Sequence, residues 1–332
     1  MKAVVSRSAG GPDTLAIEDI AEPELVPGSV LVSIRAVGLN YPDLLIIEDR
    51  YQFRPQRPFS PGAEISGVVE AVGEGVSSLG PGDRILAVVG WGGMVQKAVI
   101  EADRCIRIPD AMPFEEAAAF LMTYGTSYHA LADRARLRKG ETLLVLGASG
   151  GTGSAAVELG KAMGARVLAA VSSEEKLEAA REAGADDGLI YPSGPLDAAA
   201  QKELAARFKA LCGKEGADVV YDPIGGDYAE AALRAIAWEG RYLVIGFPAG
   251  IPRLPLNLPL LKGCDICGVF WGSAIERDPE RHRQAVAGLF ELYGRGAIRP
   301  RIDGVYPLED AATALKALAA RQVRGKAVLT VS

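Results

Sequence analysis

Residues 143–160, LLVLGASGGTGSAAVELG, join an apolar run to a helical pattern through a cluster of glycines. A strand, a glycine turn and a helix in direct succession are the setting in which proteins bind the pyrophosphate of a dinucleotide. Glycine permits the tight turn and lets backbone N–H groups approach the phosphates. A glycine pattern alone is weak evidence, but here a strand precedes it and a helix follows it, as dinucleotide binding requires. The residues expected at the phosphates are Ser149, Gly150, Gly151, Thr152 and Gly153.

The next apolar run, RVLAAV, is followed by Ser172, Ser173 and Lys176. An acid at this point would bind the ribose 2′-hydroxyl of NAD. A carboxylate about 5 Å from a 2′-phosphate would cost about 3 kcal/mol at an effective dielectric constant near 20. Two hydroxyls and an ammonium suit the phosphate instead, so the sequence favours NADPH. The structural alternative is that Ser172 caps the following helix, with Glu175 completing a capping box. Both can hold at once.

The two halves of the chain differ in how their apolar residues are spaced. From residue 141 onward, near-continuous apolar strands alternate with helical segments rich in Ala, Glu and Lys. This alternation is typical of a doubly wound α/β sheet of buried parallel strands. Residues 1 to about 120 contain short Val and Ile runs between Gly and Pro turns, which predicts an irregular, mostly β domain. At 332 residues the chain is long enough for two cores.

Composition excludes several classes of function. The 42 acidic and 36 basic residues are spread without blocks, which gives no electrostatic footprint for nucleic acid or for an anionic membrane. The first stretch, MKAVVSRSAGGPDTL, lacks a signal-peptide core, and no uncharged run reads as a membrane span. The four cysteines suggest no disulfide framework, and Cys264 and Cys267 read as small apolar side chains in a strand. We expect a cytoplasmic protein.

The glycine spacing fits two patterns, GxxxGxG of short-chain dehydrogenases and AxGxxG of medium-chain reductases. Short-chain enzymes begin with this motif and need Tyr-x-x-x-Lys, whereas here a β-rich domain precedes it and no tyrosine has lysine four residues later. With AVGLNYPDLL, PGAEISGVV, PGDRI, GADDGLIY, VVYDPIGG and GKAVL, nearly the whole chain resembles one family. That family is the zinc-free quinone oxidoreductases, related to zeta-crystallin, of the medium-chain dehydrogenase/reductase superfamily.

The resemblance implies a Rossmann dinucleotide-binding domain, residues 124–268, inserted in a GroES-like, mostly β catalytic domain of residues 1–123 and 269–332. Zinc alcohol dehydrogenases of this fold bind catalytic zinc through a Cys, a His-Glu pair and another Cys. The matching positions here are Asn40, Ala63 and Thr123. Without thiolate or imidazole we expect no tetrahedral zinc site, and no metal to polarise an alcohol.

The resemblance also implies roles for individual residues. Of the candidate catalytic residues, Asn40 lies near the nicotinamide, and Asp43 lies behind the residues that contact it. Tyr51 is a proton donor or a substrate contact, with packing in the loop as the alternative. For Tyr41 and Asp43 the alternatives are core and turn residues. The resemblance also implies that Arg321 and Lys326 face the cofactor or an acidic substrate tail. For Phe270 the alternative is the core. The remaining cofactor-binding residues are Thr126, Tyr191, Gly246, Phe247, Phe270, Trp271 and Gly272, and the substrate cleft contains Tyr41, Tyr51, Trp91 and Phe247.

The resulting hypothesis is a metal-free oxidoreductase that transfers hydride from NADPH to a quinone or another activated enone. One alternative is reduction of a 2-enoyl thioester, for which Arg50, Arg54 and Arg57 could bind the coenzyme A phosphates. A second, non-enzyme alternative is a protein that binds NADPH as a sensor or structural component. The family implies a homodimer formed through the edge strand in CDICGVF.

Overall fold

The computed structural model describes residues 1–332. The chain forms two compact units, Met1–Met122 with Pro300–Ser332, and Thr123–Arg299. From the sequence, residues 269–332 were expected to belong to the catalytic domain. In the structure, residues 269–299 lie in the second unit instead. The reason is that this segment packs there: Trp271 covers Gly125, and Arg281 binds Asp133 at 2.6 Å.

The second unit contains a six-stranded, wholly parallel sheet in the order β10-β9-β8-β11-β12-β13. This is the order of a dinucleotide-binding Rossmann sheet, which confirms the doubly wound α/β prediction. Its apolar runs of Val, Leu and Ala are buried because helices cover both faces. The strands are β8 (Thr142–Leu146), β9 (Arg166–Val171), β10 (Asp187–Ile190), β11 (Ala217–Asp222), β12 (Ile236–Val244) and β13 (Asp265–Gly268).

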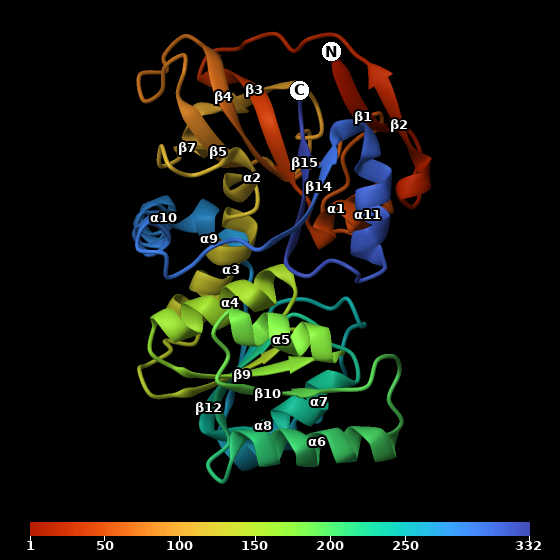
Figure 1. Cartoon of the computed structure of the whole chain (residues 1–332), viewed down its shortest axis with the longest axis vertical. Helices are drawn as coiled ribbons and strands as arrows, with labels where there is room; N and C mark the ends of the chain where they lie inside the picture. Colours follow the sequence, from red (N-terminus) through yellow and green to blue (C-terminus); the bar gives the residue numbers. More distant parts are fainter. The chain divides into compact units, whose positions relative to one another are not determined.

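Helices of this unit lie on both sides of the sheet (Figure 1), with α4 and α5 on one face and α6, α7 and α8 on the other. Two further helices, α9 and α10, follow β13. A helical stretch with π-helical turns at Leu121–Gly125 and His129–Arg134 leads into β8. The helices are α3 (Thr126–Tyr128), α4 (Gly151–Ala162), α5 (Glu174–Glu182), α6 (Ala198–Cys212), α7 (Tyr228–Leu233), α8 (Asn257–Lys262), α9 (Trp271–Arg277) and α10 (Pro279–Gly294).

The first unit is built on a seven-stranded, mostly antiparallel sheet in the order β14-β15-β3-β4-β5-β7, with β6 also paired to β3. The last strand of the chain, β15, pairs with β3, so the C-terminal segment completes this sheet. β1 and β2 form a separate two-stranded sheet. The strands and helices of the unit are β1 (Lys2–Ser6), β2 (Leu15–Asp19), β3 (Ser29–Gly38), α1 (Tyr41–Ile47), β4 (Glu64–Val72), β5 (Arg84–Val88), β6 (Lys97–Glu101), β7 (Cys105–Arg107), α2 (Phe114–Ala117), β14 (Ile302–Pro307), α11 (Ala311–Ala319) and β15 (Lys326–Thr330).

A core of Val, Ile and Leu from β1, β3, β4 and α11 fills this unit. None of the helices in either unit combines the length and hydropathy that a bilayer-spanning segment needs.

Candidate cofactor and acceptor site

The glycine turn joins β8 to α4 in the second unit. Gly147 has φ +59°, a conformation that suits glycine. A Cβ on Gly153 would lie 2.1 Å from the Gly147 carbonyl oxygen, so only glycine fits there. Gly150 is the N-cap of α4, and no side chain caps this helix. The N–H groups of its first turn therefore remain available to an anionic ligand, and the turn fits a pyrophosphate.

The side chains after β9 form a hydroxyl–ammonium pair. Lys176 donates from Nζ to Ser172 Oγ at 3.1 Å. Ser173, rather than Ser172, caps α5, because its Oγ accepts from the Lys176 backbone N–H at 3.4 Å. Expecting Ser172 to be the cap was therefore wrong. Glu174 is directed along the helix toward Arg181, 3.8 Å away. The pair of Ser172 and Lys176 fits a 2′-phosphate.

Residues at the carboxyl ends of β12 and β13 differ in exposure. Phe247 is 42% exposed and Phe270, at the N-cap of α9, is 48% exposed, so Phe270 does not lie in the core. Trp271 is buried instead, with its ring over Gly125. Tyr191 is buried as well, its ring 4.8 Å from that of Tyr228. Gly246 precedes Phe247, Gly272 is exposed, and Thr126 is half-buried at the start of α3.

Asp222, at the end of β11, is a buried residue that sequence reasoning missed. Its Oδ1 accepts from the backbone N–H groups of Ile224 and Gly225, and its Oδ2 accepts from the Tyr242 hydroxyl at 2.5 Å. Burial raises the pKa of this carboxyl. The contacts fix the loop after β11, at the sheet edge where ligands bind in open α/β folds. The sequence signal was an acid directly after an apolar strand.

In the first unit, Asn40 belongs to a buried polar network. Lys326 donates from Nζ to Asn40 Oδ1 at 2.6 Å and to Glu64 Oε2 at 3.1 Å. Asn40 Nδ2 donates to the Gly38 carbonyl oxygen at 3.1 Å and to Glu64 Oε2 at 3.0 Å. Glu64 Oε1 accepts from the Met122 backbone N–H at 2.9 Å. The amide of Asn40 is thereby held in one orientation.

Asp43 lies beside this network and is fully buried. Its carboxylate accepts from the backbone N–H groups of Asn40 at 2.8 Å and Ala63 at 3.0 Å. Burial raises the pKa of Asp43 to about 6, against these hydrogen bonds and the Lys326 ammonium, which lower it. Lys326 is buried as well, and its ammonium binds Asn40 and Glu64. Sequence reasoning also missed Glu64, whose signal was an acid beginning an apolar strand.

Of the predicted catalytic residues, Asn40 and Asp43 are buried, and Tyr51 alone is partly exposed. It is half-buried against the core of the first unit, with its ring 5.9 Å from that of Phe53. Burial and the charge of Asp43 raise the pKa of Tyr51, so its phenol stays protonated at neutral pH. Tyr41 is 37% exposed and Trp91 is 42% exposed.

The arginines near Tyr51 are mostly engaged with acids. Arg57 binds Asp49 at 2.7 Å, and Arg50 binds Glu48 at 2.9 Å. Arg54 is exposed, as is Arg321 at the end of α11. Pairing leaves this loop less cationic than its sequence suggested.

Comparison with known proteins identifies the family. Residues 26–110 match the alcohol dehydrogenase GroES-like domain, and residues 151–290 match the zinc-binding dehydrogenase family. The quinone oxidoreductase-like protein 2 of Bos taurus is 35% identical over 319 residues, 96% of this chain and 89% of that protein. The chain belongs to the quinone oxidoreductases of the medium-chain dehydrogenase/reductase superfamily.

Two solved structures are similar to this quinone oxidoreductase over its whole length. The Escherichia coli quinone oxidoreductase complexed with NADPH has a TM-score of 0.90 and 27% identity, covering 99% of this chain and 100% of that one. The quinone oxidoreductase of Thermus thermophilus, also solved with NADPH, has a TM-score of 0.84 and 34% identity, covering 99% and 100%. The fold expectation, a Rossmann unit with a GroES-like unit, is thereby confirmed.

At the positions where zinc alcohol dehydrogenases carry their ligands, this chain has side chains that offer zinc neither a thiolate nor an imidazole. Asn40 and Thr123 are buried, and Ala63 offers only a methyl group. No three His, Cys, Asp or Glu side chains of this quinone oxidoreductase lie together in a way that could hold a metal ion. The cation beside Asn40 is the ammonium of Lys326.

Proposed function

We propose that this quinone oxidoreductase binds NADPH and transfers hydride to a quinone or another activated enone. The observation that carries the proposal is the Ser172–Lys176 pair, which follows β9 in a sheet whose glycine turn suits a pyrophosphate. The nicotinamide supplies the hydride when it is bound, and the protein supplies position and electrostatics.

The chain's own residues then have distinct roles. Backbone N–H groups at the start of α4 bind the pyrophosphate, and the hydroxyl and ammonium after β9 bind the 2′-phosphate. Thr126, Gly246, Phe270 and Gly272 are further candidates for cofactor contact. The exposed aromatic faces of Trp91 and Phe247 suit a planar acceptor. A quinone needs little electrophilic help, which agrees with a site that offers no metal ligands.

The test of the cofactor is a comparison of NADPH with NADH, using 1,4-benzoquinone as acceptor. Lys176→Ala should raise the Kd and KM for NADPH about tenfold while leaving those for NADH unchanged, because only NADPH carries the 2′-phosphate. Arg181→Ala, on the same helix, is the matched control and should change neither. Equal losses for the two cofactors would contradict the assignment of Lys176.

A second candidate is reduction of a 2-enoyl thioester, which the protonated phenol of Tyr51 favours as a proton donor. The engaged state of Arg50 and Arg57 counts against it, since the coenzyme A phosphates would need free guanidinium groups. NADPH oxidation with crotonyl-CoA and with 1,4-benzoquinone decides between the two acceptors. Tight NADPH binding without turnover on either would favour a sensor or structural protein.

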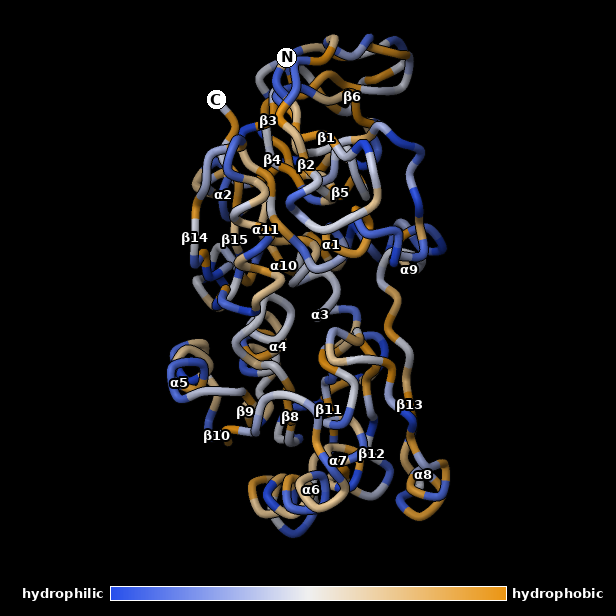
Figure 2. The backbone as a smooth tube through the Cα atoms, turned by 90° about the vertical axis from the view of Figure 1, so that its right-hand side faces the viewer, coloured by the Kyte–Doolittle hydropathy of each residue, from blue (hydrophilic) through white to orange (hydrophobic).

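We also propose that the chain works as a cytoplasmic homodimer. β13 is an edge strand with an exposed Ile266, and α8, which precedes it in the chain (Figure 2), contains the exposed Leu260 and Leu261. Pairing of two β13 strands would cover this apolar edge. All four cysteines are free thiols, as suits a reducing compartment. Light scattering should give twice the chain mass, and Ile266→Lys should lower it; a wild-type monomer would contradict the dimer.

A further inference from the structure

A second pocket of the Rossmann unit lies away from the glycine turn. It has a volume of about 410 Å³ and lies between the helical stretch before β8 and the helices α9 and α10. All of its lining residues belong to this one unit. The residues that concern its chemistry are His129, Arg134, Arg136, Trp271, Arg277 and Arg281. The proposed function uses none of them, and only Trp271 was among the residues expected at the cofactor.

The two acids of this pocket are already engaged. Asp133 Oδ1 accepts from Arg281, with Nη2 at 2.6 Å and Nε at 3.0 Å, and Asp133 Oδ2 lies 2.7 Å from His129 Nδ1. Asp278 caps α10 by accepting from the Arg281 backbone N–H at 3.0 Å. Arg281 therefore pairs with Asp133, and the four lining arginines exceed the two lining acids by two positive charges.

The other three arginines keep most of their donors unused. Arg134 donates only from Nε, to the Gly268 carbonyl oxygen at 3.0 Å, so both of its terminal nitrogens remain free to bind a ligand. The guanidinium groups of Arg136 and Arg277 make no hydrogen bond or ion pair within the protein. Arg136 also holds φ at +51°, a conformation usual for glycine after a helix. The pocket thus pairs an unfavourable backbone position with an unpaired guanidinium.

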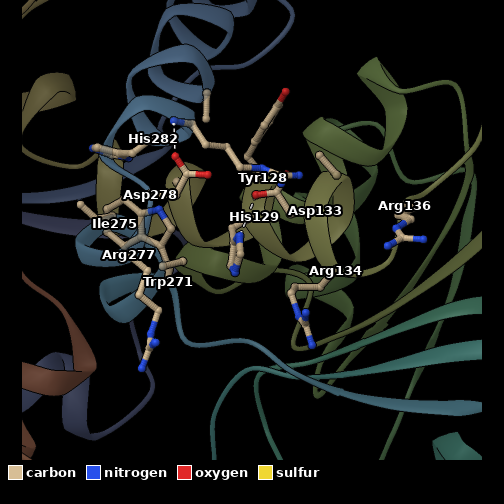
Figure 3. A pocket seen from close by; sticks show the side chains of 15 residues that line it. Tyr128, His129, Asp133, Arg134, Arg136, Trp271, Ile275, Arg277, Asp278 and His282 are labelled. Atoms are coloured by element: carbon tan, nitrogen blue, oxygen red, sulfur yellow. Dashed lines mark hydrogen bonds and ion pairs between the residues drawn. The ribbon is translucent and has the colours of Figure 1, made fainter.

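The geometry brings these donors to one opening. Figure 3 shows Arg134 and Arg277 on either side of His129, with both guanidinium groups extending past the imidazole on the same side of the pocket. Because Nδ1 of His129 faces Asp133, its Nε2 faces this opening. Beside the donors lies an apolar wall of Trp271 and Ile275, with the Trp271 ring 5.7 Å from that of His282.

We propose that this pocket binds a small organic molecule through a phosphate group, at a site separate from the cofactor's 2′-phosphate. Two guanidinium forks offer more N–H donors than the two oxygens of a carboxylate can accept, whereas a phosphate carries three oxygens and up to two charges. The volume lies within the range of small-molecule pockets and exceeds what a phosphate alone requires. The remaining space adjoins the indole of Trp271, which suits an apolar or aromatic ester group.

Titration with phenyl phosphate, followed by calorimetry, tests the site, with benzoate and phenol as probes that lack the phosphate. Phenyl phosphate should bind more tightly than either. Arg277→Ala and Arg134→Ala should each weaken its binding by about tenfold or more, because each removes charge-assisted donors. Arg283→Ala is the matched control, since Arg283 lies on α10 outside the pocket and binds Glu280.

Lys176→Ala separates this site from the cofactor site. It should weaken NADPH without affecting phenyl phosphate, and Arg277→Ala should do the reverse. Competition of phenyl phosphate with crotonyl-CoA would assign the phosphate to an acceptor's tail, and binding without such competition would assign it to a separate effector. The proposal is overturned if phenyl phosphate shows no saturable binding, or if its binding is displaced by NADPH and indifferent to Arg277→Ala.

Discussion

Replacing Lys326 with methionine removes the buried ammonium while keeping most of the side chain's apolar volume. The side chain is 6% exposed and that of its partner Glu64 is 1% exposed. At their separation of 3.1 Å, two unit charges attract by about 5 kcal/mol at an effective dielectric constant of 20. Glu64 would keep the Met122 N–H and the Asn40 amide as partners. We therefore expect Lys326→Met to lower the free energy of unfolding by about 3 to 5 kcal/mol.

Urea denaturation of four proteins measures this effect: wild type, Lys326→Met, Glu64→Gln and the double variant. The double variant should be more stable than the sum of the single losses implies, because it leaves no unpaired buried charge. Lys2→Met, which breaks the exposed pair with Glu309, should cause no measurable loss. Additive losses, or a Lys326→Met protein as stable as wild type, would refute the argument.

Three further outcomes follow from the site. Gly153→Ala should abolish NADPH binding in a fluorescence titration, since its Cβ would meet the Gly147 carbonyl oxygen at 2.1 Å, whereas Gly11→Ala, in open space, should not. Burial raises the pKa of Asp43 to about 6 from its ordinary 3.8, so the native chain binds more protons than the unfolded chain between these values. The stability that Asp43 contributes should then fall as the pH rises from about 4 to about 6, and Asp43→Asn should flatten this part of the unfolding curve. Tyr51→Phe should lower kcat for crotonyl-CoA about a hundredfold or more if the phenol is the proton donor, and should leave 1,4-benzoquinone reduction nearly unchanged.

Local patterns in the sequence were sufficient for the dinucleotide-binding half of the fold. The alternation of apolar runs with helical segments gives a parallel sheet because buried strands need helices on both faces. The glycine turn at Gly150 and Gly153 and the hydroxyl–ammonium pair after β9 are likewise set by residues close together in the chain. Family resemblance, rather than periodicity, predicted that the rest of the chain forms a GroES-like unit.

Contacts between distant residues could not be read in the same way. Lys326 meets Asn40 across 286 positions and Glu64 across 262, so neither partner is visible in any window of the sequence. The sequence did not show which of Phe270 and Trp271 is buried, for a local reason. The helix α9 begins between them, and an apolar run does not reveal which residue turns inward there. The boundary near residue 269 failed because α9 and α10 pack on the second unit.

The buried network of Asn40, Glu64 and Lys326 limits which predicted catalytic residue can donate a proton to the acceptor. Both amide hydrogens of Asn40 are donated, to Gly38 and Glu64, and its oxygen accepts from Lys326. Its amide is therefore held to position the backbone around it rather than to donate to a ligand. Among the predicted catalytic residues, only Tyr51 keeps a protonated group outside this network. After hydride transfer a quinone becomes a hydroquinone anion, which takes one proton from water. The enolate formed from an enoyl thioester instead needs a positioned proton donor. Retained quinone reduction in Tyr51→Phe would thus agree with a site organised by its cofactor and its aromatic surface alone.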